Sequence, residues 1–276
     1  MEQDSQFRFV KSEHLPGLTL LQAAMDGFAY DRHAHEEHSF GVTLAGRQDF
    51  FSGGANHHSM PGNIIQFNPG EVHDGCSGGD DPLNYVMIYV PVSELEPLVA
   101  TAAGREQATD FRVNETLMQD QTLREAILEL ARLISNKVGS RIEQEHALYQ
   151  IASRVTQRAG RFEADDITRR ADVLLERARE FIQAHVTEDL ALEDISEAAN
   201  LSKYHFLRLF RKQFGITPHQ YVVNCRINAA RHALDTGDSL NDVVYRYGFA
   251  DLSHFNRRFK RIYGMTPRQY QASIAS

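Results

Sequence analysis

Two segments near the C-terminus carry the side chains best suited to recognising a charged polymer. Ser202–Tyr221 reads SKYHFLRLFRKQFGITPHQY, and Asp251–Tyr270 reads DLSHFNRRFKRIYGMTPRQY, at an offset of 49 residues with no gap. Nine of the 20 aligned positions are identical, against about one expected from average composition. A repeat this close predicts two copies of one structural unit.

In each copy, apolar and polar positions alternate with the period of a helix. Phe206, Phe210 and Phe214 recur every four residues in the first copy, and Phe255, Phe259 and Ile262 follow in the second. These residues should face a core, which leaves a basic face outside. Arg and Asn on such a face can bond guanine and adenine in the major groove. The outward residues are Lys203, Tyr204, Leu207, Arg208 and Arg211 in copy one and Leu252, Ser253, Asn256, Arg257 and Lys260 in copy two.

The charge distribution supports a polyanionic partner for this end of the chain. Residues 1–200 hold 17 basic and 33 acidic residues, a net charge of −16, whereas residues 201–276 hold 12 basic and 4 acidic residues, a net charge of +8. Such asymmetry indicates that one end meets a polyanion. A solvated basic face is the alternative explanation, and the repeat favours the DNA interpretation over it.

Shorter helices must position these basic helices. A helix carrying Leu192 and Ile195 should precede the first copy, and one carrying Val243 and Tyr247 should precede the second, each followed by a tight turn. Ser202 and Asp251 are the expected N-caps, and Gly215 and Gly264 should end the helices. Two helices joined by a tight turn form a helix-turn-helix motif. A helix over about 219–235, ~24 Å long, should join the two motifs.

The first half of the chain has a different pattern. Short apolar runs at 18–23, 39–44, 63–67 and 85–90 alternate with turn clusters at 51–56, 60–63 and 75–82, which predicts a β-sandwich or barrel. Helical periodicity follows, with one apolar stripe at Leu123, Ile127, Leu130 and Ile134 and a second at Leu148, Ile151 and Val155. These stripes should pack on the barrel or contribute to a dimer contact. The sequence contains no run of about 18 apolar residues, so no membrane span is predicted. Cys76 and Cys225 are expected to be free thiols.

The C-terminal region resembles the DNA-binding domain of the AraC/XylS family of bacterial transcription regulators. The residues that carry this resemblance are Gly248–Phe249, Asp251, Ser253, Phe255, Arg257, Phe259–Lys260, Gly264, Thr266–Pro267 and Tyr270. The resemblance implies that the two basic helices enter successive major grooves. It makes Tyr204, Leu207, Arg208, Ser253, Asn256 and Arg257 the candidates for reading bases. Phosphate contact or simple solvation is expected for Lys203, Arg211, Lys212, Lys260 and Arg261.

The segment Gly41–Gly75 is similar to the cupin-like sensory domain that precedes this module in many family members, above all at Pro61–Gly62 and at residues 68–73, NPGEVH. The resemblance implies a small-molecule effector inside the barrel. The ligand-binding candidates are Arg32, His33, His35, His73, Tyr85, Met87 and Tyr89. For Tyr85 and Tyr89, a plain core role is the alternative.

The pair His33 and His35, with His73 later, also resembles the metal ligands of cupin enzymes. Those enzymes place a carboxylate about four residues beyond the second histidine, where this chain has Ser39 or Phe40. A structural or organic-ligand role is therefore preferred over metal, and no cofactor is expected.

The sequence thus predicts an α+β protein of two domains. Residues 1–160 form a cupin-like β-barrel (jelly roll) with flanking helices for ligand sensing and dimerisation, 161–170 a linker, and 171–276 an all-α domain with two helix-turn-helix motifs joined by a linker helix. The expected function is that of a cytoplasmic transcriptional regulator, an activator rather than an enzyme. Its expected partners are double-stranded DNA, a small-molecule effector, a second copy of the chain and RNA polymerase. Two alternatives stay open: a metal-dependent cupin enzyme fused to a DNA-binding module, and a constitutive regulator whose barrel only dimerises.

Overall fold

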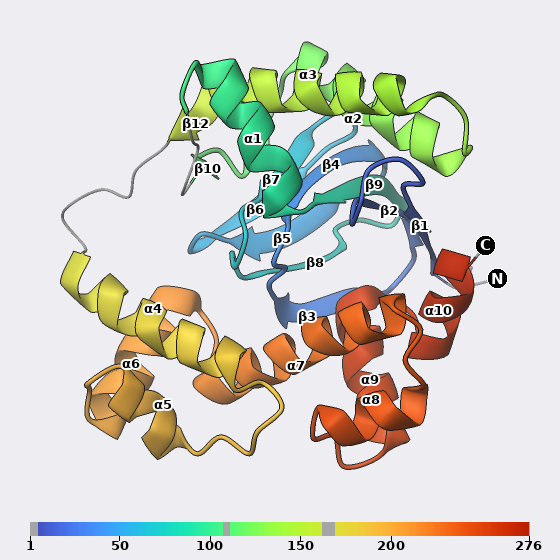
Figure 1. The fold of residues 1–276 in the computed structure, drawn as a ribbon. Coiled ribbons are helices and arrows are strands. Elements are labelled where there is room, and N and C mark those ends of the chain that lie inside the picture. The colour runs from blue at the N-terminus through green and yellow to red at the C-terminus, as the bar shows by residue number, and fades with distance from the viewer. Residues whose placement is uncertain (1–4, 107–110, 162–168, 276) are drawn as a thin grey trace. The chain divides into compact units, whose positions relative to one another are not determined.

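Alternation of apolar and polar residues builds two antiparallel sheets from the first half of the chain. The computed structural model describes residues 5–106, 111–161 and 169–275 (Figure 1). The larger sheet has the strand order β1-β2-β9-β4-β7-β11 and the smaller one the order β3-β8-β5-β6. The strands are β1 (Gln6–Lys11), β2 (Thr19–Met25), β3 (Ala29–His33), β4 (His38–Ala45), β5 (Gln48–Ser52), β6 (Ala55–Ser59), β7 (Ile64–Phe67), β8 (His73–Ser77), β9 (Leu83–Val90) and β11 (Leu117–Met118), with β10 (Arg112–Val113) pairing β12 (Gly160–Arg161) separately.

The two sheets face each other. The hydroxyls of Tyr30 and Tyr85 lie 2.8 Å apart, joining β3 to β9. Thr43 Oγ1 and Ser59 Oγ lie 2.7 Å apart between β4 and β6. A double layer of antiparallel strands is the arrangement of a jelly roll, so the predicted fold class of this half is confirmed.

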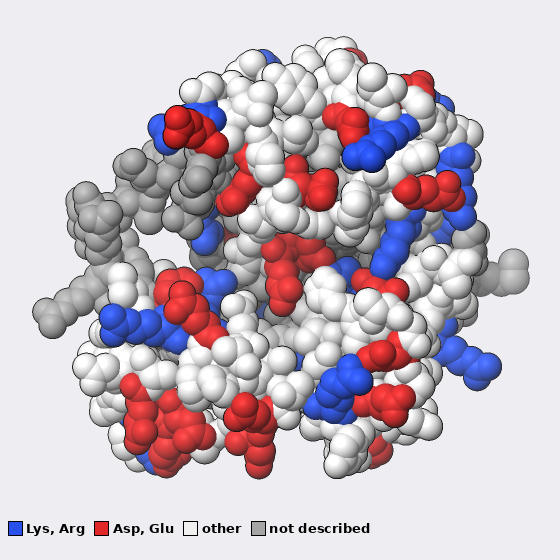
Figure 2. All heavy atoms as spheres, viewed as in Figure 1, with Lys and Arg blue, Asp and Glu red and all other residues white. Residues whose placement is uncertain are grey.

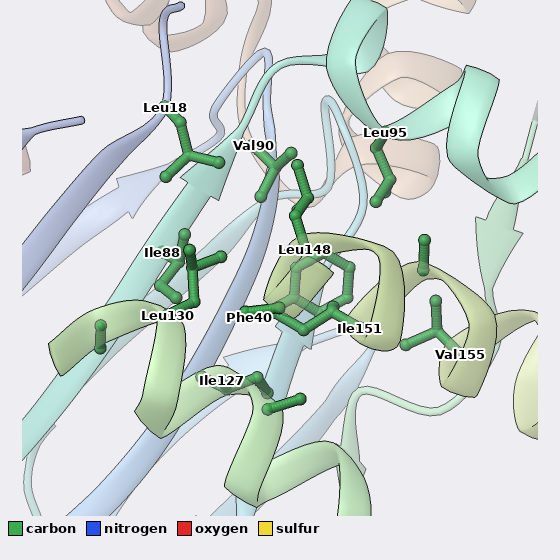
Figure 3. Close-up of a cluster of buried hydrophobic side chains, with 14 of the residues drawn as sticks. Leu18, Phe40, Ile88, Val90, Leu95, Ile127, Leu130, Leu148, Ile151 and Val155 are labelled. Carbon is green, nitrogen blue, oxygen red and sulfur yellow. The ribbon is translucent and has the colours of Figure 1, made fainter. Parts of the chain in front are cut away.

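Helices cover the outer face of the larger sheet. They are α1 (Val92–Ala103), α2 (Gln121–Ser135) and α3 (Arg141–Ala159). Figure 3 shows Phe40 and Ile88 of the sheet in one cluster with Ile127, Leu130 and Leu148 of the helices. The predicted apolar stripes of α2 and α3 are buried in this cluster. These helices therefore pack on the sheet through the stripes that the sequence indicates.

Two predicted turn clusters are in part strands. Gly53 and Gly54 have φ values of +58° and +84°, which suits a two-residue hairpin turn. This tight turn lets Phe51 pair with Asn56 and Ser52 with Ala55, so the predicted turn at 51–56 shrinks to the two glycines. In the same way, Gly75–Ser77 belongs to β8. The turn prediction was wrong at these positions because small polar residues can also pair along a short strand.

The second half of the chain is helical, as predicted. Contacts divide the chain into one unit of residues 1–164 with 272–276 and another of residues 165–271. Of the predicted linker, Arg161 lies in β12 and Arg169 begins α4, while 162–168 lie outside the described residues. None of the helices within the described ranges is long and apolar enough to cross a membrane. The helices of this half are α4 (Arg169–Ala184), α5 (Leu192–Ala198), α6 (Lys203–Phe214), α7 (Pro218–Asp235), α8 (Leu240–Arg246), α9 (Leu252–Tyr263) and α10 (Pro267–Ala275).

A buried carboxylate connects α2 to α3. Asp120 is the N-cap of α2, where its Oδ1 accepts a hydrogen bond of 2.9 Å from the Leu123 amide. Its other oxygen, Oδ2, lies 2.8 Å from Arg154 Nη2 and 3.1 Å from Arg158 Nη1. The hydrogen bond from Arg154, together with that from the Leu123 amide, lowers the pKa of Asp120 to about 2 against the raising effect of burial. The carboxylate therefore stays ionised across the physiological range.

We expect Asp120→Asn to destabilise the N-terminal unit by about 2 kcal/mol at pH 7, because the amide keeps the cap but loses the charge. The folded carboxyl has a pKa below its ordinary value of 3.8. The stabilisation is therefore complete above that value and is lost as the pH falls through about 2. Thermal unfolding of the full chain at several pH values measures it. Glu115→Gln, which removes an exposed partner of Arg158, is the control and should cost at most about 0.5 kcal/mol. Equal losses for the two variants would contradict this account.

Candidate functional site

The two basic helices rest on matched aromatic cores. In α6, Phe206 and Phe210 are fully buried, with ring centroids 5.3 Å apart, and Phe214 is partly buried. In α9, Phe255 and Phe259 are fully buried at 5.6 Å. The same face of each helix is therefore turned inward, and the opposite face of each is available to a partner.

The two copies differ by one residue at the turn. Asn200 (φ +51°) and Gly248 (φ +66°) both adopt the left-handed conformation after the first helix. The next amide closes the turn in each copy, from Leu201 to the Ser196 carbonyl and from Phe249 to the Val244 carbonyl. Between this point and the second helix, copy two contains one extra residue, Ala250. The first helices are thus related by an offset of 48 and the second helices by 49.

The structure places most of the predicted DNA-contacting residues on the outer faces of α6 and α9. Tyr204 is 89% exposed although it is a large aromatic residue. Leu207 and Asn256 are partly buried at the edges of these faces. The remaining predicted side chains are exposed: Lys203, Arg208, Arg211, Lys212, Ser253, Arg257, Lys260 and Arg261. His205 is also exposed, whereas His254 is partly buried and its ring lies 6.0 Å from that of Phe249.

Charge differs sharply between the two helices of the first motif. Three exposed carboxylates, Glu193, Asp194 and Glu197, lie on α5, and acidic side chains gather over this helix in Figure 2. Lys203, at the start of α6, forms an ion pair with Glu193. The next exposed basic residues of α6, Arg208 and Arg211, lie further along the helix than this ion pair.

Tyrosines at equivalent repeat positions connect each motif to a different neighbour. Tyr221 accepts a hydrogen bond of 3.1 Å from Arg179 Nε of α4, and burial raises its pKa to about 12. Tyr270 is fully buried and donates a hydrogen bond of 2.8 Å to Asp235 at the end of α7. The repeat thus supplies one anchoring hydroxyl to each motif, and both motifs are fixed to α7 or its neighbour α4.

In the N-terminal unit, three buried imidazoles converge. His33 ends β3, His35 follows it, and His73 begins β8. Their ring centroids lie 4.6 to 5.3 Å apart. One ring nitrogen from each lies within 4.8 Å of the other two. The fold thus brings the three histidines together, as far as their ring nitrogens are concerned, in one place.

The surroundings keep the imidazoles of His33 and His73 neutral and oriented. Burial lowers the pKa of His33, and it lowers that of His73 well below the ordinary value of 6.5, with a further contribution from His33. His33 Nδ1 donates to the Asp31 carbonyl at 2.6 Å, and His73 Nδ1 donates to the Glu71 carbonyl at 2.9 Å. Both rings therefore present Nε2 as a lone pair at neutral pH.

Strand parity decides which of the other ligand candidates face the interior. Val86, Ile88 and Val90 of β9 lie in the helix-covered core, so the opposite face of β9 points between the sheets. That face carries the predicted Tyr85, Met87 and Tyr89. Tyr89 lies against His35, with ring centroids 4.9 Å apart.

Arg32, in contrast, does not join this group. Its Nε lies 3.3 Å from Asp74 Oδ2, and its guanidinium lies over the Phe51 ring. Its side chain is 41% exposed. A strand places neighbouring residues on opposite faces, which separates Arg32 from His33.

Three interior residues are not among the ligand-binding residues predicted from the sequence. Tyr30 bonds Tyr85, Phe67 stacks on His73 at 3.6 Å, and Ser39 is fully buried. Regular alternation would place Tyr30 and His33 on opposite faces of β3, because they lie three positions apart. The register between β3 and β8 shifts between these two residues, so both can face the interior. The interior positions of Phe67 and Ser39 follow only from the pairing of β4 with β7 and β9, in which Ser39 is opposite both Phe67 and Tyr89.

A sheet-rich domain with a polar interior, followed by two helix-turn-helix motifs, is the organisation of a DNA-binding protein with a separate N-terminal domain. Comparison with known families agrees with this class. The AraC-like ligand binding domain family matches residues 15–152, and a helix-turn-helix domain family matches residues 195–273. The chain belongs to the AraC/XylS family and is a DNA-binding transcriptional regulator with a ligand-binding domain.

Individual relatives give the same assignment. The uncharacterized HTH-type transcriptional regulator YbfI of Bacillus subtilis is 29% identical over 224 residues, which is 81% of this chain and 80% of YbfI. The XylDLEGF operon transcriptional activator of Pseudomonas putida is 28% identical over 40% of this chain and 35% of its own length. ToxT of Vibrio cholerae O395 shares the fold, with a TM-score of 0.60 at 14% identity over 99% of both chains. Wild-type ToxT of strain SCE256 with bound unsaturated fatty acid gives 0.63 at 12% identity, over 96% of this chain and 98% of that one.

The two basic helices differ in their caps, and this difference can be measured. Asp251 Oδ1 accepts a hydrogen bond of 2.7 Å from the His254 amide, whereas the Ser202 side chain makes no such bond to α6. We therefore expect Asp251→Ala to reduce the stability of α9 by about 1 kcal/mol, and Ser202→Ala to change α6 by only a few tenths. Native-state hydrogen exchange of peptides from each helix measures both effects. Equal loss of protection in α6 and α9 would show that the caps are equivalent in solution.

Proposed function

We propose that this regulator binds operator DNA by placing α6 and α9 in successive major grooves on one face of the duplex. The observation that carries the proposal is the matched pair of exposed basic faces on α6 and α9, each opposite a buried aromatic core. The connecting helix α7 has 18 residues, which corresponds to about 27 Å. Grooves on one face of B-DNA recur about every 34 Å, so α7 and its flanking turns suit this separation.

Within these helices, we assign base reading and phosphate binding to different residues. Arg208 and Arg257 occupy equivalent positions and are suited to guanine, and Asn256 is suited to adenine. Tyr204, Ser253 and Leu207 contribute further base contacts, with Leu207 limited to apolar contact such as a thymine methyl group. Phosphate contacts come from Arg211, Lys212, Lys260 and Arg261, and from Lys203 once a phosphate replaces Glu193 as its partner.

We expect Arg208→Ala and Arg257→Ala each to weaken binding to the preferred operator by about 1–3 kcal/mol and to relax specificity at one base position. Fluorescence anisotropy with operator variants measures both effects. The matched control is Arg132→Ala, because Arg132 is an exposed helical arginine of the N-terminal unit that pairs with Glu129. An unchanged operator affinity in both test variants would overturn the assignment of the recognition helices.

The N-terminal unit controls this binding through a small-molecule effector held between its two sheets. This role, rather than enzyme activity, suits an interior lined by His33, His35, His73, Tyr85 and Tyr89. Carboxylic acids are the first effector class to test, since a fatty acid is bound in one ToxT structure. The regulator would act in the cytoplasm as an activator that contacts RNA polymerase, with residues 1–160 as the sensory domain, 161–170 as the linker and 171–276 as the DNA-binding domain.

We further propose that α2 and α3 form a homodimer contact. Their outer surfaces enclose a groove lined by residues that include Glu125, Glu129, Tyr149 and Gln150. Along α3, Ile142 is 71% exposed and Tyr149 is 39% exposed. These two residues lie seven positions apart and therefore share one side of the helix. Large apolar side chains on one exposed side favour contact with a second copy.

We expect the double variant Ile142→Glu with Tyr149→Glu to shift the protein toward monomer, because each carboxylate would have to be desolvated in the contact. Sedimentation equilibrium of the full chain measures the change. Met60→Glu is the control, since Met60 is 52% exposed in the same unit and lies in the turn between β6 and β7, not on α2 or α3. A double variant that associates as strongly as the unaltered protein would place the dimer contact elsewhere.

A further inference from the structure

We propose that His33, His35 and His73 bind one divalent transition-metal ion, and that this ion receives an anionic group of the effector. The second part rests on the proposed effector control. The first part does not, because metal binding can be measured without DNA or effector.

The geometry of the three imidazoles already approaches that of a metal site. His35 Nε2 donates a hydrogen bond of 3.1 Å to His33 Nε2, a separation close to the value of about 3.3 Å for two nitrogens bound tetrahedrally to Zn²⁺. A metal ion would take the place of the shared proton. The nitrogen of His73 lies within 4.8 Å of both, so it needs to approach by about 1.5 Å at most to complete a site of that size. Imidazole is a suitable ligand for Zn²⁺, Cu²⁺, Fe²⁺ and Ni²⁺.

The neighbouring groups hold the rings as metal-bound histidines are commonly held. His33 and His73 each donate Nδ1–H to a backbone carbonyl, which directs Nε2 toward the centre of the cluster. Phe67 stacks on His73, and Tyr89 contacts the edge of His35. All three imidazoles are at most 5% exposed. Backbone and aromatic contacts thus fix the three rings before any ion arrives.

The charge balance of this cluster points to an anionic further ligand. Among the described residues, the cluster contains three histidines and no carboxylate. Two carboxylates lie close to His73 in sequence, and both are engaged elsewhere: Asp74 bonds Arg32 and the Phe51 amide, and Glu71 bonds Ser52 and Asn68. A dication held by three neutral nitrogens in a buried place keeps its full charge, which is costly unless an anion joins it. An effector carboxylate, or hydroxide in its absence, would supply that anion.

The protein itself offers little alternative attraction for an anion in this interior. The buried polar and charged side chains among the described residues of the N-terminal unit include no Lys or Arg. Ser39 pairs with Phe67 and Tyr89, the two residues that contact the cluster. Its hydroxyl is buried and has no hydrogen-bond partner in the part of the chain that the structure describes. Ser39 is thus a suitable donor to an anion bound at the metal, at the place where cupin enzymes would carry a carboxylate.

Cobalt binding tests the metal site. The full-length protein is stripped with chelator and titrated with Co²⁺, followed by visible absorption and by metal analysis after gel filtration. We expect one ion per chain in the unaltered protein and in His58→Ala, an exposed histidine of the neighbouring β6. We expect loss of stoichiometric binding in His33→Ala and His73→Ala. No binding to the unaltered protein, or equal binding by all variants, would overturn the site.

The histidine variants could also lose metal because they unfold. Two further measurements on folded protein therefore test the site independently. X-ray absorption of the zinc-loaded, unaltered protein should show imidazole nitrogens at about 2.0–2.1 Å; a shell without imidazole would overturn the ligand set. Acetate should change the Co²⁺ spectrum of the unaltered protein, and Ser39→Ala should weaken this response while Co²⁺ binding stays intact. An acetate-insensitive spectrum would overturn the anion part alone. Operator binding, measured separately on the same samples, reports on the proposed regulatory function and does not depend on these outcomes.

Discussion

The burial of both faces of one sheet constrains the whole N-terminal unit. From Tyr85 to Val90, every residue of β9 is buried, because helices cover one face of the strand and the smaller sheet covers the other. Alternation along the strand then assigns each residue to one of two separate environments. Val86, Ile88 and Val90 join the apolar core under α2 and α3, and Tyr85, Met87 and Tyr89 line the polar interior. Any change in the interior can therefore reach α2 and α3 through a single strand.

The DNA-binding unit depends on the repetition of one aromatic pattern around a shared helix. Each recognition helix is fixed by its own phenylalanines, and each motif ends in a tyrosine with a polar anchor. The anchors differ, since Tyr221 is held by Arg179 of α4 and Tyr270 by Asp235 of α7. The extra residue at the second turn is a further difference between the copies. The two motifs therefore have unlike supports and present unlike outer residues.

For the three histidines, the arrangement in the fold suggests a different role from the one that their spacing in the sequence favours. A sequence with histidines at 33, 35 and 73 but no carboxylate at the expected spacing favours a structural or organic-ligand role. In the fold, two of the rings are oriented by carbonyl acceptors, and the third donates a hydrogen bond to the first. In the proposed metal site, the negative charge that the sequence pattern lacks would come from an anionic effector.

The sequence by itself determined the features that depend on local periodicity. The repeat, the buried faces of α6 and α9, the glycine ends of these helices and the apolar stripes of α2 and α3 all follow from spacing within one element. Spacing says nothing of partners that are distant along the chain. The pairing of Tyr30 with Tyr85, the stacking of Phe67 on His73, the exclusion of Arg32 from the interior and the position of Ser39 depend on strand order and register. These were decided only by the tertiary structure, because hydrogen bonding between strands, and not the order of residues along them, sets which side chains meet.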